Sequence, residues 1–167
     1  GYWNGNVWMS HQWFVWKTML DNGDTDFAFE IANRALEMWK EETDFTYFTY
    51  ECFGIKTRRG GWFHNFGGLS APISIWANAY YKSGTVTTGL DVWTDYQNVT
   101  DDSAEISFKY FGNNDKYSMI VTLDDKNSYK ATVDGKPVDF KLRNGSALEF
   151  TFDGKIKQGV LKIEIAQ

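Results

Sequence analysis

Glu51 is the residue best placed to do chemistry, because it lies within an aromatic segment, Tyr50-Glu51-Cys52-Phe53. Two further segments share this character: Tyr2-Trp3-Asn4-Gly5-Asn6-Val7-Trp8 and Gly60-Gly61-Trp62-Phe63-His64-Asn65-Phe66. Flat sugar faces pack on Trp and Tyr rings, while sugar hydroxyls need amide, imidazole and carboxylate partners that are held in place. The three segments therefore predict a carbohydrate site, with Glu51 as the candidate for chemistry.

Glu51 suits one half of a known two-carboxylate reaction. Inverting hydrolysis of a glycosidic bond uses two carboxyl groups about 6.5–9.5 Å apart, one to protonate the leaving oxygen and one to activate water. A general base must be ionised, partly buried and directed at water, which favours Glu51 for the second role. The alternative is an ordinary helix-end or surface carboxylate. Other acidic residues nearby lie on a solvated helix face or lack the aromatic setting: Glu30, Glu37, Glu41, Glu42 and Asp44.

The predicted substrate-binding residues flank Glu51 in the other two segments. We expect Trp3 and Trp62 to stack on sugar rings, and Trp8 is a third candidate. Each ring has a structural alternative, since aromatic side chains also fill protein cores. The remaining candidates for sugar contacts are Asn4, Gly5 and His64, with Asn6, His11 and Gln12 as further hydrogen-bonding side chains.

Other chemistries have no support in the sequence. No group of His, Cys, Asp and Glu has metal-ligand spacing, and neither a phosphate-binding loop nor a serine nucleophile elbow is present. We therefore predict no metal and no cofactor. Cys52 has no basic neighbour in the sequence to activate its thiol, so we interpret it as a packing residue.

Charge and hydropathy exclude two classes of partner. A formal net charge of -5 offers no basic stripe for phosphates, which argues against nucleic-acid binding. No apolar run approaches the roughly 20 residues that span a bilayer, so no membrane partner is expected. No signal peptide is visible either, and the compartment stays open.

The first half of the chain shows helical periodicity. Residues 7–20 suit a helix buried on most of its surface, and Asn22-Gly23 supplies the left-handed residue that ends it. A second helix follows Asp24 or Thr25, and a third runs from about Ser70 to Gly84. Trp13, Trp16, Trp39 and Trp76 recur at helical spacing and are predicted core residues.

The pattern changes to a period of two after about residue 100, which predicts an antiparallel β-sandwich over residues 100–167. Residues 84–99 are then a linker. Two-residue turns that favour hairpins separate several of the predicted strands: Asp134-Gly135, Asn144-Gly145 and Asp153-Gly154. The predicted strands are 104–111, 117–123, 129–133, 138–142, 147–152 and 160–165.

The three aromatic segments resemble motifs of inverting glycosidases with an (α/α)6 barrel, the trehalases and glycoside hydrolase family 63, which includes mannosylglycerate hydrolases. Residues 2–8 are similar to their Tyr-Trp-Arg-Gly-Pro-Ile-Trp motif, residues 50–53 to the loop with the general base, and residues 61–68 to the segment that closes the site. Asn4 and Asn6 stand where that motif has Arg and Pro. The resemblance covers residues 1–83.

The resemblance implies an α+β chain: a helical segment of an (α/α)6 toroid at 1–83, the linker 84–99 and the β-sandwich at 100–167. It implies Glu51 as general base, a glucoside- or mannoside-like substrate, and a general-acid Asp in a missing N-terminal part of the barrel. The isolated chain is then expected to be incomplete and inactive. All eight Trp precede residue 94. We therefore expect much apolar surface in this region, which such a missing part or a partner would cover. Two other classes stay open, a non-catalytic carbohydrate-binding module and a structural accessory domain.

Overall fold

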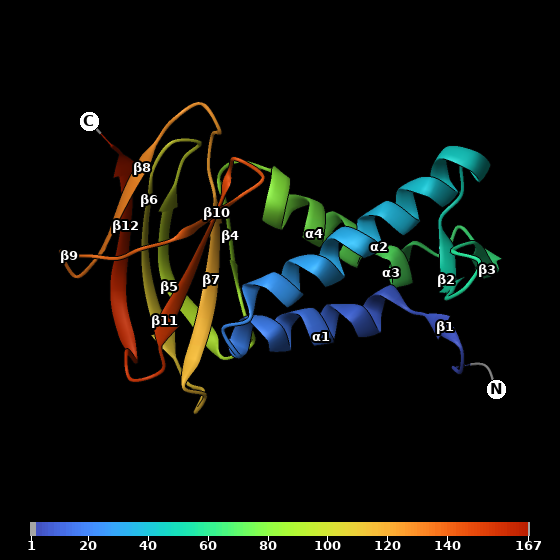
Figure 1. Ribbon diagram of the computed structural model, residues 1–167, viewed down its shortest axis with the longest axis horizontal. Coiled ribbons are helices and arrows are strands. Elements are labelled where there is room, and N and C mark those ends of the chain that lie inside the picture. The colour runs from blue at the N-terminus through green and yellow to red at the C-terminus, as the bar shows by residue number, and fades with distance from the viewer. Residues whose placement is uncertain (1–2, 167) are drawn as a thin grey trace. The chain divides into compact units, whose positions relative to one another are not determined.

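The computed structural model describes residues 3–166, in which antiparallel sheets are combined with helices (Figure 1). The helices are α1 (Met9–Asp21), α2 (Thr25–Thr46), the single turn α3 (Gly67–Ser70) and α4 (Pro72–Tyr81). The chain divides into two compact units: unit 1 comprises Gly1–Trp16 and Asp26–Ala77, and unit 2 comprises Lys17–Thr25 and Asn78–Gln167. No helix in the described range is long and apolar enough to cross a membrane.

Unit 1 combines helices with a small antiparallel sheet of strands in the order β1 (Asn6–Val7), β2 (Tyr50–Gly54) and β3 (Gly60–His64). In α2, alanine and isoleucine recur at helical spacing on the buried side, at Ala28, Ile31 and Ala35. The Trp16 and Trp76 rings meet edge to face with centroids 6.2 Å apart, and both side chains are fully buried. The prediction of core positions at Trp16 and Trp76 is confirmed.

The prediction of a helical segment of an (α/α)6 toroid is wrong. The chain is mainly β, with three antiparallel sheets, and no toroid segment is evident in residues 3–166. The three aromatic segments pair with one another as strands β1, β2 and β3. Helix α2 runs from Thr25 to Thr46 before the chain enters β2.

Unit 2 contains two antiparallel sheets that face each other (Figure 1). One sheet has the order β10-β11-β7-β4 and the other β5-β6-β12-β8-β9. Strand bounds are β4 (Thr85–Thr88), β5 (Val92–Val99), β6 (Ala104–Tyr110), β7 (Lys116–Thr122), β8 (Tyr129–Val133), β9 (Lys136–Pro137), β10 (Lys141–Arg143), β11 (Ala147–Asp153) and β12 (Gln158–Ile165).

Side chains from both sheets form one core, because alternate residues of each strand point inward. Ile106 and Phe108 of β6 meet Phe150 and Phe152 of β11 in this core, where the Phe108 and Phe152 rings stack at 5.5 Å. The predicted β-sandwich therefore fits in part. Its strands begin earlier than expected, since residues 84–99, predicted as a linker, contain β4 and β5, which pair with β7 and β6.

One predicted strand is mostly absent. Residues 138–140 are in no strand, because β9 ends at Pro137 on the edge of one sheet and β10 begins only at Lys141 on the edge of the other. Proline has no N–H for a ladder, which confines it to such edges. The chain thus changes sheets between the two short strands.

Candidate functional site

The three aromatic segments come together in the small sheet of unit 1 (Figure 1). Val7 of β1 lies opposite Phe53 of β2, and Tyr50 of β2 lies opposite His64 of β3. Val7 and Phe53, more than 40 residues apart in the sequence, are therefore neighbours across hydrogen-bonded strands. The sheet places the candidate base and the predicted sugar-binding segments within one structural element.

Glu51 occupies an irregular position in this sheet. Tyr50 pairs with His64 and Cys52 with Gly61, so Trp62 and Phe63 of β3 form a bulge opposite Glu51. Bulges redirect a side chain relative to the regular pleat and are common beside active sites. The Glu51 side chain is buried, with the residue 6% exposed. On the adjacent Tyr50, the carbonyl oxygen accepts a 2.9 Å hydrogen bond from the Ser70 hydroxyl, which fixes the strand at this point.

The predicted stacking residues divide into exposed and buried ones. Trp3 and Trp62 are 56% and 58% exposed, so their rings are available to a ligand. Trp8 is buried and supports Trp3, with ring centroids 4.1 Å apart. His11 meets Trp3 edge to face at 5.2 Å and is exposed rather than a core histidine. Asn4 and Gly5 are both exposed beside Trp3, and Gly5 has a φ of 82°.

Trp62 has an unusual backbone conformation. Its φ is 64°, and that of Asn65 is 61°, both in the left-handed region. A bulky residue there is an outlier that costs on the order of 1–3 kcal/mol, and such positions cluster at active sites and ligand clamps. The Trp62 ring is nevertheless exposed, so burial of that ring does not repay the strain.

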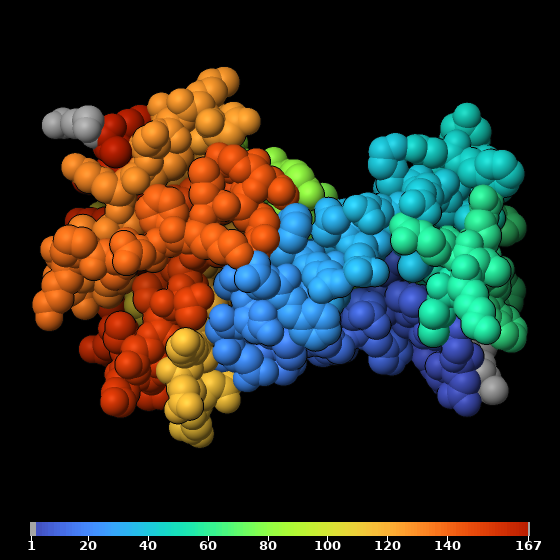
Figure 2. Space-filling model, in the orientation of Figure 1, coloured from blue at the N-terminus to red at the C-terminus, as the bar shows by residue number. Residues whose placement is uncertain are grey.

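His64 belongs to an aromatic rim that sequence analysis only partly recognised. The His64 and Phe48 rings lie 4.9 Å apart, and both side chains are exposed. Figure 2 shows the surface of the α2–β2 connection and the β2–β3 turn in teal. The high aromatic content of this region indicated a group of rings. Only the end of α2 at Thr46 shows which of them lie outside a helix. Further exposed rings in this part of unit 1 are Phe45, Tyr47, Phe63 and Phe66.

The thiol beside Glu51 is unsuited to nucleophilic chemistry. Burial raises the pKa of Cys52, and the negative charge of Glu51 raises it further, while a hydrogen bond with the Asn6 side chain offsets part of this change. A raised pKa keeps the sulfur protonated near neutral pH, and only the thiolate is a good nucleophile. Cys52 is fully buried and lies opposite Gly61, which agrees with its interpretation as a packing residue.

The other buried carboxylates in residues 3–166 bind structural partners, which makes them poor candidates for a general base. Asp21 accepts hydrogen bonds from the backbone N–H groups of Leu90 and Asp91 at 2.9 and 3.0 Å. The remaining two form ion pairs with arginine: Glu42 with Arg59 and Glu149 with Arg143. Within the described part of the chain, no group of three or more His, Cys, Asp or Glu side chains is arranged to hold a metal ion.

Comparison of the chain with protein-family models, with curated proteins and with solved structures gave no match.

Proposed function

We propose that this chain carries the general base and part of the sugar-binding surface of a glycoside hydrolase that inverts the anomeric centre. The observation that supports this most is the convergence of three aromatic segments in one small sheet, with Glu51 opposite the bulge of β3. Exposed Trp3 and Trp62 lie in the two segments that adjoin the Glu51 strand. Rings of this kind suit the flat faces of a sugar, and a glucoside- or mannoside-like substrate follows from the motif resemblance.

Each residue has a distinct role in this proposal. Glu51 takes a proton from the attacking water, while Trp3 and Trp62 hold sugar rings and Asn4 and His64 bond their hydroxyls. Trp8 acts indirectly by supporting the Trp3 ring. The general acid is a second carboxyl group supplied by protein outside these 167 residues, at the about 6.5–9.5 Å separation that leaves room for water.

The experiment uses the polypeptide that contains this sequence together with the second carboxyl group. Glu51→Gln keeps the side-chain shape but cannot accept the proton of water, so kcat should fall about 10²–10⁴-fold with little change in substrate affinity. Glu37→Gln, at an exposed carboxylate of α2, is the matched control and should leave kcat unchanged. NMR of the first-formed sugar should show an inverted anomer. A retained anomer, or a Glu51→Gln enzyme with near-normal turnover, would contradict the proposal.

A second candidate is carbohydrate binding without hydrolysis. The observation in its favour is the 6% exposure of Glu51, which restricts the access of water to a base, whereas Trp3 and Trp62 are open to ligand. This candidate predicts that Trp62→Ala abolishes sugar binding while Glu51→Gln leaves binding unchanged and no substrate is hydrolysed by the complete polypeptide.

A further inference from the structure

Three exposed aromatic rings lie on unit 2. They are far in the sequence from the candidate site, which belongs to unit 1. Trp93 and Tyr96 of β5 are 65% and 52% exposed, and Phe111, directly after β6, is 61% exposed. The Trp93 and Phe111 rings are 5.4 Å apart with an interplanar angle of 67°. Contiguous exposed rings are uncommon on monomeric domains and often mark an interaction site.

A β-bulge places the two β5 rings on the same face of the sheet. Residues three apart normally point to opposite faces of a strand. In β5 the register with β6 shifts between Thr94 and Tyr96, so that Trp93 lies opposite Lys109 and Tyr96 opposite Ser107. Lys109 and Ser107 alternate with buried Phe108 and therefore share the outer face. Trp93 and Tyr96 consequently both point outward, at an edge of the sheet.

Phe111 belongs to the same outer face. The preceding residue, Tyr110, is buried in the core opposite Val92. Because successive side chains of a strand point to opposite faces, Phe111 points outward. The Phe111 backbone N–H donates to the Asp91 carbonyl oxygen at 2.8 Å, which continues the ladder past the end of β6. The rings thus come from two hydrogen-bonded segments, which fix the spacing between them.

The surroundings of the rings are polar, which distinguishes among possible ligands. Asp95, the bulged residue, pairs with Lys109 at 2.8 Å, and Ser107 and Asn98 share the outer face with the rings. The rest of this face of the sheet carries ion pairs, Lys162–Glu105 and Lys130–Glu164. A protein interface of ordinary size needs a more extended surface with a largely apolar centre. A few rings with a rim of amides, hydroxyls and charges suit a sugar.

We propose that Trp93, Tyr96 and Phe111 form a saccharide-binding site on the outer face of β5 and β6. The rings stack on pyranose faces along β5, and the Asp95–Lys109 pair together with Asn98 bonds the hydroxyls at its rim. A ligand with successive sugar units, rather than a monosaccharide, fits a row of rings that follows a strand. This site binds and does not hydrolyse, and it does not depend on the role proposed for Glu51.

The test is retardation of the whole chain in native gels that contain glycogen, a soluble mannan or a mixed-linkage β-glucan. All variants carry Trp3→Ala and Trp62→Ala, so that the candidate site of unit 1 cannot contribute. The parent should be retarded in at least one gel, and Trp93→Ala should weaken binding about tenfold or more, because it removes the largest ring. Tyr81→Ala, at a 53% exposed tyrosine of α4, is the matched control and should bind as the parent does.

Folding of the variants is checked by thermal melting, and Trp93→Phe should restore part of the retardation because a smaller ring remains. Absence of retardation of the parent in all three gels would overturn the proposal, as would equal retardation of parent and Trp93→Ala. Sedimentation of the parent as a dimer that Trp93→Ala dissociates would also overturn it, since the rings would then form a protein interface.

Discussion

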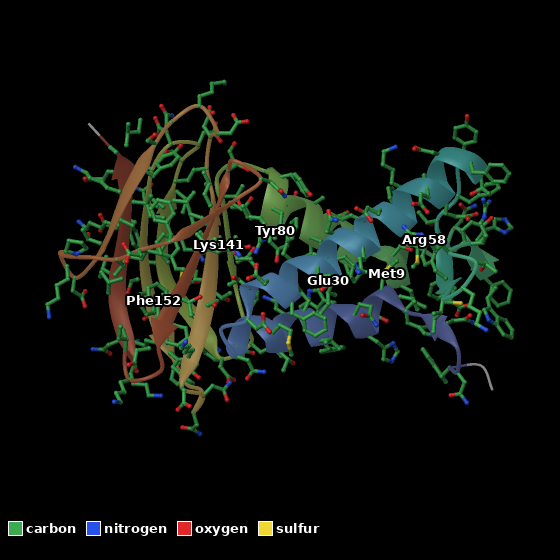
Figure 3. The ribbon with its side chains drawn as sticks, in the orientation of Figure 1. Met9, Glu30, Arg58, Tyr80, Lys141 and Phe152 are labelled. Atoms are coloured by element: carbon green, nitrogen blue, oxygen red, sulfur yellow. The ribbon has the colours of Figure 1, made fainter. Side chains whose placement is uncertain are left out.

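The carboxylate of Glu42 and the guanidinium of Arg59 form an ion pair of 2.7 Å that joins the C-terminal part of α2 to the turn between β2 and β3. The Glu42 side chain is 3% exposed, whereas that of Arg59 is 46% exposed. The Arg59 guanidinium also lies 4.2 Å from the centroid of the Phe45 ring. The neighbouring residue, Arg58 (Figure 3), forms a second, exposed ion pair between the same two elements. Its guanidinium donates to both carboxylate oxygens of Glu41 at 2.9 Å.

These adjacent pairs should differ strongly in their contribution to stability. Arg59→Ala leaves the Glu42 carboxylate buried without its partner, and breaking a buried pair in this way costs about 3 kcal/mol. Arg58→Ala breaks a pair in which both partners are exposed, which costs less than about 1 kcal/mol. Denaturant unfolding of both variants measures the difference. Equal losses would show that the burial of Glu42 does not govern the pair.

Two Asp-Gly turns that look alike in the sequence should respond differently to the same substitution. A Cβ on Gly154 would lie 1.9 Å from the Asn114 carbonyl oxygen, so Gly154→Ala must displace backbone and should destabilise unit 2 by about 3 kcal/mol. Gly135 has a φ of 78° and open space around it, so Gly135→Ala should cost only about 1 kcal/mol of backbone strain. A smaller loss for Gly154→Ala than for Gly135→Ala in thermal melts would contradict this explanation.

The same turns show what sequence could predict. Local signals were sufficient where a residue's own conformation decides the structure: Asn144-Gly145 and Asp134-Gly135 have positive φ at both residues. Gly23 also ends α1 in the left-handed region, with the Asp24 N–H donating to the Met19 carbonyl oxygen. Asp153-Gly154 does not follow this rule. Glycine is needed there because a distant loop approaches it, and no local pattern reveals such an approach.

Pairing between distant segments limited the rest of the prediction. The aromatic segments were recognised as a group, but the pairing of β1 with β2 joins residues more than 40 positions apart. The bulge of β3 opposite Glu51 and the one between Thr94 and Tyr96 are properties of strand pairs, so Trp93 and Tyr96 gave no signal of sharing a face. The β-branched run Thr85–Thr88 did carry a strand signal, which the neighbouring glycines obscured.

Tyr117 should make unit 2 sensitive to alkaline pH. Its ring is fully buried against Tyr110, with centroids 4.0 Å apart, and its hydroxyl donates to the Ile156 carbonyl oxygen at 2.7 Å. Burial raises the pKa of the Tyr117 phenol well above its ordinary value, and nearby Tyr110 adds to the increase. The unfolded chain therefore loses this proton from about pH 10 while the folded chain keeps it.

The folded state binds more protons than the unfolded state above that pH, so the free energy of unfolding must decrease as pH rises, by at most about 1.4 kcal/mol per pH unit from this group. Tyr117→Phe removes that contribution. At pH 8 the variant should be less stable by about 1 kcal/mol, because the Ile156 carbonyl loses its donor. The difference in free energy of unfolding between the two proteins should disappear between about pH 10 and pH 11.5, as measured by urea unfolding. Burial also raises the pKa of Tyr129, which both proteins retain, so some alkaline loss remains in each. A gap that is constant across this pH range would mean that Tyr117 ionises in the folded chain as readily as in the unfolded one.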